Sequence, residues 1–471
     1  MPESRMTVPG IDFGTIRTEF DVPGAFSAAA RSAAENPPDR CASSRVDATD
    51  LALVTIDPPG SMDLDQAVHL ERTETGFVVH YAIADVGAVV EPGGPLDVET
   101  RRRGQTFYLP DGSVPLHPRT LSEGSASLLP DVVRPAALWR IEIDDRGEPT
   151  SWGVARSLVK SVARLDYSTV QRDADNNSLH PSIAALPEFG RLRTASAIER
   201  GAVELKLPEQ SVVRDAASAG GWRIELEPRT EADGWNAEVS LLTGMCAGRM
   251  MLQAGIGLLR TLPPAERSAV DVLRKTALAL GIDWPAGASV GRILAGLDPT
   301  LPSTMAVMSV APSLLRGADY AAFDGELPEL TIHAGIGAPY AHVTAPLRRL
   351  SDRFSTEVCL SISAGTAVPD WARTALPDLP AIMRGSDSLA NKVDRACVDL
   401  TETTLLADRT GEVFDAVVMR AKDGKRAAEV FLPSVAVIAR CLGTPDDGTR
   451  VKVRLSAVDA DKRTVEFTFP A

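Results

Sequence analysis

The sequence has few cysteines, no long apolar run and no excess of positive charge. Its five cysteines are scattered over 471 residues, without a C-x-x-C pair or a histidine at zinc-site spacing. This usage argues against a zinc site and is typical of the reducing cytoplasm. No run of about 18 apolar residues predicts a membrane span, and the N-terminus lacks the apolar core of a secretory signal. We therefore expect a cytoplasmic protein that binds neither zinc nor a membrane.

The formal net charge is −14, from 49 lysines and arginines and 63 aspartates and glutamates. This charge argues against a protein that coats nucleic acid with its whole surface. It leaves open an enzyme that threads one strand through a local basic channel. Nothing in the sequence indicates an extended coiled coil, and we expect a monomer.

The pattern along the chain predicts three parts. Residues 1–45 are rich in proline, serine and alanine and are too short for a separate domain. Residues 46–408 mix apolar strand-like runs with helical patterns, and residues 409–471 contain short β-like runs that predict a small OB-like barrel. The fold class is α+β, a mixed β-sheet with surrounding helices followed by the barrel. In the middle part we predict strands over 51–56, 63–70 and 76–84, and helices over 96–104, within 188–260, and over 265–280 and 346–363.

The most informative segment is acidic and reads T-I-D-P-P-G-S-M-D-L-D-Q-A, residues 55–67. Asp63 and Asp65 are two residues apart, and on an extended strand they would point to the same face. Asp57 ends the preceding strand, and the intervening turn can bring it beside them. Three converging carboxylates repel one another unless a cation lies between them, and Mg²⁺ prefers such oxygen ligands. The segment therefore predicts a metal site for phosphodiester chemistry, although three aspartates alone are more often a solvated polar turn.

A second informative segment reads Y-A-H-V-T-A-P-L-R-R-L-S-D, residues 340–352. Pro346 suits the first position of a helix, and the unpaired N–H groups of a helix N-terminus favour anions. In that first turn Arg348 can make a bidentate contact to a phosphate. The alternative is a local ion pair of Arg348 with Asp352, four residues further on.

Together these segments resemble the RNB catalytic domain of the ribonuclease II and ribonuclease R family. The resemblance extends from about residue 51 to 399. T-A-P-L-R-R resembles the family's T-S-P-I-R-R segment. Four stretches follow the family's order: residues 55–67, 80–110 with its continuation over 114–130, 201–205 leading to a helix around Glu238, and 332–349.

The resemblance implies a hydrolytic 3′→5′ exoribonuclease that degrades single-stranded RNA to nucleoside 5′-monophosphates with Mg²⁺, or with Mn²⁺. Tyr108, in T-F-Y-L-P, matches the tyrosine that contacts the 3′-terminal nucleotide, although packing of this ring in the core is an equal alternative. Trp222 and Trp235 are expected to pack in the core rather than to stack on bases. The resemblance assigns the site residues to three roles: Asp65 and Arg348 to catalysis, Asp57, Asp63, Asp65 and Gln66 to the metal, and Tyr108, Thr344 and Arg349 to the substrate.

The sequence departs from the family pattern in two respects. Gln66 stands where the family has a fourth acid, which weakens one metal position. The residues before 46 are too few for the two cold-shock domains that typical members carry, so we expect a short form with weaker binding to long RNA. Two alternatives follow: a catalytically weak or inactive protein that binds RNA 3′ ends, and a metal phosphoesterase that acts on short oligonucleotides or DNA.

Overall fold

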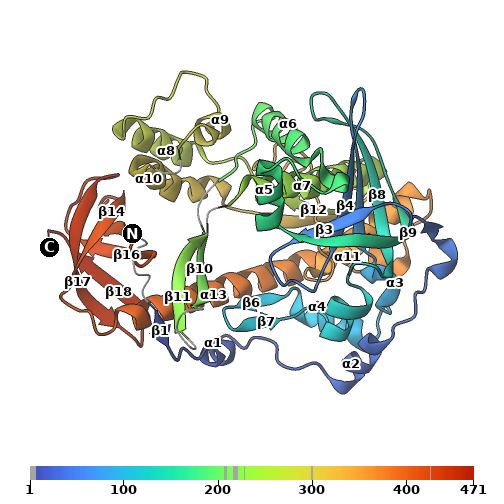
Figure 1. Cartoon of the computed structure of the whole chain (residues 1–471), viewed down its shortest axis with the longest axis horizontal. Coiled ribbons are helices and arrows are strands. Elements are labelled where there is room, and N and C mark those ends of the chain that lie inside the picture. Colours follow the sequence, from blue (N-terminus) through green and yellow to red (C-terminus); the bar gives the residue numbers. More distant parts are fainter. Residues whose placement is uncertain are drawn as a thin grey trace.

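A six-stranded mixed sheet lies at the centre of the larger part of the molecule (Figure 1). The computed structural model describes residues 7–205, 209–215, 221–227, 229–298, 301–424 and 426–470. Across the sheet the strands are β2 (Val46–Asp47), β9 (Pro149–Asp166), β3 (Leu53–Asp57), β4 (Gln66–Arg72), β5 (Gly76–Ala84) and β8 (Val133–Asp144). The first part of β9 pairs antiparallel with β8 and its last residues pair parallel with β3. The strands predicted over 51–56, 63–70 and 76–84 are β3, β4 and β5.

The strand β5, which lies between β4 and β8, is buried on both faces, because each face packs against other apolar elements. Val79, Tyr81 and Ile83 belong to the largest core cluster, which includes side chains of the helices α7 (Glu231–Ala254) and α11 (Leu350–Ser363). The alanines of β5 belong to a second cluster with α3 (Val86–Val89) and α4 (Pro95–Arg103). A strand covered on both faces reads as a continuous apolar run rather than an alternating one. This coverage explains why its sequence predicted the strand well.

Helices surround the sheet, and several were predicted. The helix expected over 96–104 is α4, which ends at Gly104 with a positive φ of 74°. The helix expected over 265–280 is α8 (Arg267–Ala279). The long helix α13 leads from the sheet to the C-terminal barrel (Figure 1). The remaining helices are α1 (Gly14–Glu19), α2 (Ala28–Glu35), α5 (Tyr167–Asp175), α6 (Leu186–Glu199), α8 (Arg267–Ala279), α9 (Val290–Ala295), α10 (Pro302–Val310), α12 (Asp370–Arg373) and α13 (Leu379–Leu406).

The helix predicted over 346–363 begins four residues later, at Leu350. The backbone N–H of Ala345 donates to the Asp352 carboxylate at 2.7 Å, and that of Leu347 donates to Asp65 at 2.7 Å. These bonds hold residues 346–348 in a turn. Arg348 therefore lies before the helix, and its predicted position in the first helical turn is wrong. Its contact with a phosphate stays a prediction.

Region 188–260 contains the predicted helices α6 and α7 and also strands that were not predicted. The strands β10 and β11 form a hairpin between the helices, and β1 pairs with β11. The hairpin is rich in charged residues, which hides the alternation of an amphipathic strand. The strands outside the central sheet and the barrel are β1 (Val8–Pro9), β6 (Phe107–Leu109), β7 (Gly112–Val114), β10 (Glu209–Asp215), β11 (Gly221–Glu227), β12 (Ile256–Thr261) and β13 (Asp319–Asp324).

The C-terminal residues form a closed five-stranded barrel, as the sequence predicted. Its core contains Phe414, Val430, Leu455 and Phe467. Four of the strands coincide with the predicted β-like runs, and β16 was missed. Around the barrel the strands are β14 (Val413–Arg420), β15 (Ala428–Leu432), β16 (Val437–Leu442), β18 (Thr464–Thr468) and β17 (Arg450–Asp459).

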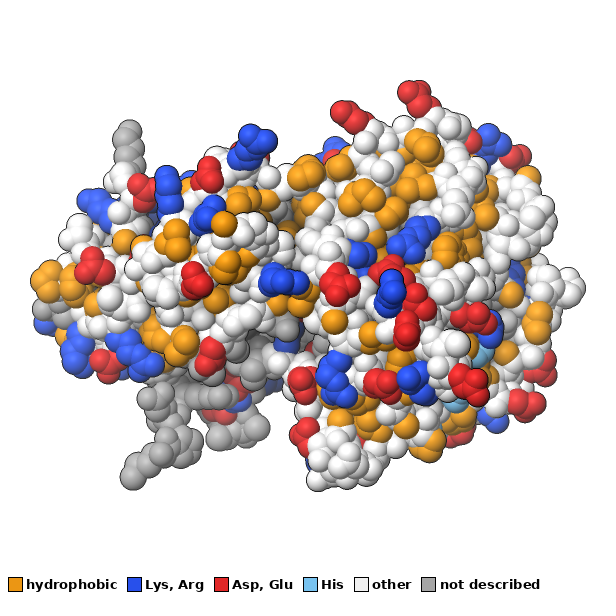
Figure 2. All heavy atoms as spheres, turned by 90° about the horizontal axis from the view of Figure 1, so that it is seen from above, with side chains coloured by type: hydrophobic (Ala, Val, Ile, Leu, Met, Phe, Trp, Pro, Cys, Tyr) orange, Lys and Arg blue, Asp and Glu red, His pale blue; other side chains and the backbone are white. Residues whose placement is uncertain are grey.

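The surface carries interspersed acidic and basic side chains, with apolar groups between them, over the described part of the face in Figure 2. No helix in the described ranges is both long and apolar enough to cross a membrane. All five cysteines are free thiols.

Two glycines of α7 allow the arginine segment to lie directly on this helix. A Cβ atom at Gly244 would be 2.7 Å from the backbone oxygen of Ala341, and one at Gly248 would be 2.7 Å from the backbone nitrogen of Tyr340. The carbonyl of Gly244 also accepts a hydrogen bond from the N–H of Ala341 at 3.0 Å. A larger residue on this helix face would push the segment that contains Arg348 away from the sheet.

We expect Gly244→Ala to lower the free energy of unfolding by about 1–3 kcal/mol, because the added methyl group overpacks this contact. Gly234→Ala on the same helix is the control, since nothing lies within 4 Å of its Cβ position; it should be neutral or stabilising by up to about 1 kcal/mol. Urea denaturation of the two variants measures the difference. Equal stability of both would contradict the close contact.

Candidate active site

The acidic segment is an irregular loop and not the extended strand that the sequence predicted. Asp57 ends β3, whereas Asp63 and Asp65 precede the first residue of β4. Ser127 fixes the loop, because its hydroxyl accepts a hydrogen bond from the N–H of Leu64 at 3.0 Å. The loop buries Asp65, which is 2% exposed, and leaves Asp63 half-buried. The two side chains therefore do not share one face of a strand.

Asp65 binds the arginine segment through both carboxylate oxygens. Oδ1 accepts the N–H of Leu347 at 2.7 Å, and Oδ2 lies 3.4 Å from Nε of Arg348. The Arg348 side chain remains 46% exposed, so part of its guanidinium is open to a ligand. The expected alternative, an ion pair of Arg348 with Asp352, is wrong: Asp352 pairs with Arg349 at 2.9 and 3.0 Å.

The acids of the loop share one electrostatic environment. Burial raises the pKa of Asp57 to about 6 and that of Asp65 to about 8. In both cases the Arg348 guanidinium opposes the rise and Asp63 adds to it. Oδ2 of Asp57 is buried and has no hydrogen-bond partner among the described residues. A buried carboxylate oxygen without a partner is costly unless a cation or a proton neutralises it.

The role of Asp57, Asp63 and Asp65 as metal ligands stays a prediction. Within the described ranges, no group of three or more His, Cys, Asp or Glu side chains is arranged to hold a metal ion. Carboxylates without a cation between them repel one another, and Arg348 is the counter-charge that Asp65 binds. Mg²⁺ commonly uses one or two carboxylates together with water and a substrate phosphate. The unpartnered oxygen of Asp57 and the carboxylate of Asp65 suit such an ion chemically.

Gln66 joins the acidic loop to the arginine segment. Its Nε2 donates to the carbonyl of Thr344 at 2.6 Å, and its Oε1 accepts a hydrogen bond from the hydroxyl of Tyr81 at 2.8 Å. The same hydroxyl lies 2.8 Å from Oγ of Ser240. Gln66 and the buried Thr344 thus have structural contacts in place. Their roles as metal ligand and substrate contact stay predictions.

Tyr108 lies on the hairpin of β6 and β7 and is 55% exposed, so the alternative that its ring packs in the core is wrong. Its phenol interacts with the Arg348 guanidinium. The chain just before it runs beside the arginine segment, because the N–H of Thr106 donates to the carbonyl of Arg348 at 2.9 Å and Gln105 pairs with Arg349. The structure therefore brings Tyr108 to Arg348 and Asp65.

Three polar residues at this site carried no signal in the sequence. Asn236 on α7 donates to the hydroxyl of Tyr167 at 3.3 Å, and that phenol interacts electrostatically with Asp57. Ser240, one turn further along α7, contacts Tyr81. Single polar residues on a largely buried helix do not stand out without the fold.

Trp222 and Trp235 lie in the core, as the sequence analysis predicted, and His333 and His342 lie close to the arginine segment. Trp222 and Trp235 are buried, with 4% and 5% of their surface exposed. His342 is hydrogen-bonded to the hydroxyl of Tyr320 at 2.8 Å. His333 packs edge-on against Tyr340. These residues are structural parts of the core and do not extend the site.

Comparison with known proteins identifies the class. The RNB domain matches residues 45–356, and the C-terminal S1 domain of ribonuclease II-type exonucleases matches residues 412–469. The chain belongs to the RNB family of exoribonucleases, with a C-terminal S1 domain.

The relatives include active and inactive proteins. Ribonuclease R of Escherichia coli is 27% identical over 92% of this chain and 58% of its own length, so the chain spans little more than half of that relative. The structure of Mycoplasma genitalium RNase R with ribose-methylated single-stranded RNA is similar, with a TM-score of 0.85, 20% identity, and coverage of 97% of this chain and 77% of that one. Yeast Ssd1, described as a pseudonuclease, has a TM-score of 0.68 at 17% identity, over 88% of this chain and 53% of its own.

The raised pKa of Asp65 predicts how stability depends on pH. A carboxyl group whose pKa rises on folding binds a proton more tightly in the folded state, so stability falls as pH rises between the unfolded and folded values. For Asp65 this range runs from 3.8 to about 8. In EDTA, the free energy of unfolding of the wild type should fall across this range, and Asp65→Asn should flatten the fall. Urea denaturation at several pH values tests this, with the exposed Asp145→Asn as control; equal slopes in the two variants would contradict it.

Gln66→Glu should destabilise the metal-free protein by about 1–3 kcal/mol, because the new carboxylate cannot donate to the Thr344 carbonyl and leaves a buried acceptor without a partner. Thermal unfolding in EDTA measures the loss. With Mg²⁺ present, this variant should regain more stability than the wild type gains. No loss in EDTA would show that the hydrogen bonds of Gln66 do not hold the two segments together.

Proposed function

We propose that the chain is a metal-dependent 3′→5′ exoribonuclease that hydrolyses single-stranded RNA to nucleoside 5′-monophosphates. One observation carries the proposal: Asp57 and Asp65, the partly exposed Arg348 and the exposed Tyr108 lie at one place on the structure. This combination offers carboxylates for a cation, a guanidinium for a phosphate and an aromatic ring for a base. The similarity to ribonuclease R supports the direction and the substrate.

Each residue has a role in this proposal. Arg348 binds the scissile phosphate through its open side, while Asp65 holds the other side of the guanidinium. Tyr108 contacts the 3′-terminal nucleotide, and Thr344 and Arg349 support the substrate beside it. Asp57, Asp63 and Asp65 would hold Mg²⁺ or Mn²⁺, with Gln66 as a weak neutral ligand. The bound ion would supply an activated water and stabilise the leaving oxygen.

We also propose that the barrel, within residues 409–471, contributes to RNA binding. Residues 46–408 would carry the catalytic function, and residues 1–45 would be an N-terminal extension. The similar structure of Mycoplasma genitalium RNase R is a complex with single-stranded RNA, which supports single-stranded RNA as the ligand.

A second candidate function is binding of RNA 3′ ends with little or no cleavage. Two observations favour it. Gln66 replaces an acid and its amide is engaged in hydrogen bonds at both ends. The similarity to Ssd1 shows that this fold occurs in a pseudonuclease.

A labelled-RNA assay separates these functions. Single-stranded RNA with a 5′ label, incubated with Mg²⁺ or Mn²⁺, should give a ladder that shortens from the 3′ end. Asp65→Asn and Arg348→Ala should each lower the rate by about 10²-fold or more, because each removes charge stabilisation at the reacting phosphate. Arg373→Ala, which breaks a surface ion pair with Asp324, should cleave normally.

Binding without cleavage in either metal would support the second function and contradict the first. A parallel assay with a DNA substrate tests the other alternative, a metal phosphoesterase. RNA and DNA of equal sequence differ in the 2′-hydroxyl groups (and in uracil against thymine), so equal cleavage of both would favour the phosphoesterase.

A further inference from the structure

The hairpin that carries Tyr108 receives contacts from a segment far from it in sequence. This segment, residues 13–26, contains α1 and the chain that follows it, and it lies outside the residues that match the RNB domain. In Figure 1 it runs along the same side of the molecule as α4, β6 and β7. Because Tyr108 is largely exposed, its position depends on what holds the two strands of its hairpin.

The first contact is at the tip of the hairpin. The strands β6 and β7 are joined by Pro110 and Asp111. The Asp111 carboxylate accepts two hydrogen bonds from the Arg17 guanidinium on α1, at 2.9 Å from Nη1 and 2.6 Å from Nη2. Both side chains are less than one-third exposed. A paired, bidentate geometry fixes direction as well as distance.

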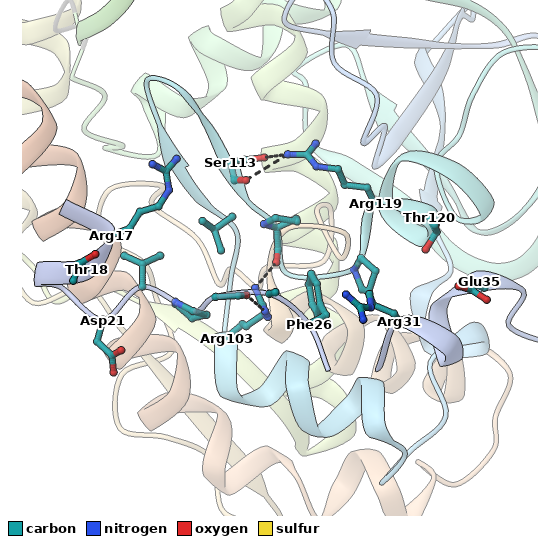
Figure 3. Close-up of a pocket in the computed structure, with 17 residues that line it drawn as sticks. Arg17, Thr18, Asp21, Phe26, Arg31, Glu35, Arg103, Ser113, Arg119 and Thr120 are labelled. Carbon is teal, nitrogen blue, oxygen red and sulfur yellow. Dashed lines mark hydrogen bonds between the residues drawn. The ribbon is translucent and has the colours of Figure 1, made fainter. Parts of the chain in front are cut away.

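The second contact is at the end of the other strand. The buried Arg103 donates to the carbonyl of Pro115, which follows β7, at 3.2 Å and to the carbonyl of Gly24 at 2.6 Å. Its guanidinium also stacks on the ring of Phe26, 3.7 Å from the centroid, as Figure 3 shows. Arg103 therefore links the hairpin to the last residues of the segment.

Between these two contacts lies an open cavity of about 820 Å³, lined by the segment, the hairpin and neighbouring residues that include Arg31 and Arg119. Ser113 lines it and pairs across the hairpin with Tyr108. Arg119 donates to the hydroxyl of Ser113 at 3.1 Å (Figure 3). On the side of this cavity, the contacts of Arg17 and Arg103 link the segment to the hairpin.

Buried contacts hold the segment itself in place, so it can restrain the hairpin. Phe13 and Ile16 are fully buried and pack in one cluster with Phe107 and Leu109 of β6 and with side chains of α13. Phe13 also packs edge-on against Trp222, with ring centroids 5.1 Å apart. Anchored contacts of this kind hold an exposed side chain in one place more tightly than a two-stranded hairpin does alone.

We propose that residues 13–26 are a brace that holds Tyr108 in place relative to Arg348, and that Arg17 is the positioning residue of this brace. The proposal rests on the proposed function, because the role of Tyr108 toward the 3′-terminal nucleotide is part of it. The hairpin meets the arginine segment through Thr106 and Gln105 and meets the brace through Asp111. Loss of the Arg17 contact removes the two hydrogen bonds at the tip of the hairpin and leaves the packing of β6 and the contact of Arg103 in place, so the tip gains freedom to move.

The test compares Arg17→Ala with the charge-swapped pair Arg17→Asp with Asp111→Arg. On a short single-stranded RNA, Arg17→Ala should raise KM about fivefold, the range of one ion pair at the surface, with kcat within about twofold. A displaced Tyr108 weakens substrate binding in the ground state and the transition state alike, so KM changes and kcat does not. A smaller folded fraction would instead lower kcat at unchanged KM. The swapped pair should restore KM.

Two further comparisons show whether Arg17 affects KM through Tyr108. In a Tyr108→Ala background, Arg17→Ala should have no additional effect on KM, because coupled residues are non-additive. Arg373→Ala, whose guanidinium makes the same two-bond contact to Asp324, should leave KM unchanged. If Arg17→Ala raised KM equally in the wild-type background and in the Tyr108→Ala background, the proposal of a brace would be overturned.

Hydrogen exchange separates failure of the brace from failure of the proposed function. Amides of residues 107–114 should exchange faster in Arg17→Ala than in the wild type and in Arg373→Ala, in buffer without metal or RNA. If the wild type neither binds nor cleaves RNA, the proposed function fails and this measurement alone decides whether Arg17 holds the hairpin. Unchanged exchange in Arg17→Ala would overturn the brace whatever the activity.

Discussion

The contact between Asp65 and the turn before α11 is the interaction on which the site depends. One carboxylate accepts a backbone N–H and pairs with a guanidinium, and it joins two segments that are 282 residues apart. The hydrogen bond fixes the turn, and the turn fixes where Arg348 points. Burial of a carboxylate is unfavourable unless its oxygens find such partners. The same contact thus explains why Asp65 tolerates its apolar surroundings and why Arg348 stays near the surface.

The surrounding fold serves to bring these two segments together. The loop that contains Asp65 is attached to the end of the sheet, while the turn lies against the glycine face of α7. Gln66 joins the two a second time, one residue from Asp65. The hairpin of Tyr108 then pairs with the arginine segment through its backbone. Main-chain hydrogen bonds hold the arginine segment to the hairpin and to α7. The side chains of Asp65 and Gln66 hold it to the acidic loop, so that contact depends on the identity of these two residues.

Much of this arrangement was predictable from the sequence. The rest was not predictable, and the reasons are physical. The apolar runs of β3 and β5 are dictated by burial, so they stand out in the sequence, and so do most strands of the barrel. β16 was missed because Ala439 and Cys441, which line its inner face, are small and weak indicators of a strand. The start of α11 was misplaced because Pro346 favours a helix locally, whereas distant carboxylates hold a turn.

The site residues, too, were predictable in part: motifs identified several of them, and the fold set their orientation. Asp57, Asp65 and Arg348 were chosen from motifs, and the structure brings them together. The geometry assigned to Asp63 and Asp65 was wrong because Ser127, 62 residues beyond Asp65, shapes the loop. Asn236 and Tyr167 could not be found, since only the fold places them next to Asp57. Local patterns identify which residues matter, and tertiary contacts decide how they are oriented.

The distance along the chain between Asp65 and Leu347 has a consequence for the order of folding. The contact closes a long loop, and contacts of this kind form late because many residues must be ordered first. During synthesis the acidic loop emerges well before residues 347 and 348, so the nascent chain displays its carboxylates to solvent without their guanidinium partner. The contact can therefore form only after residues 347 and 348 have emerged, and a shorter nascent chain lacks the completed candidate site.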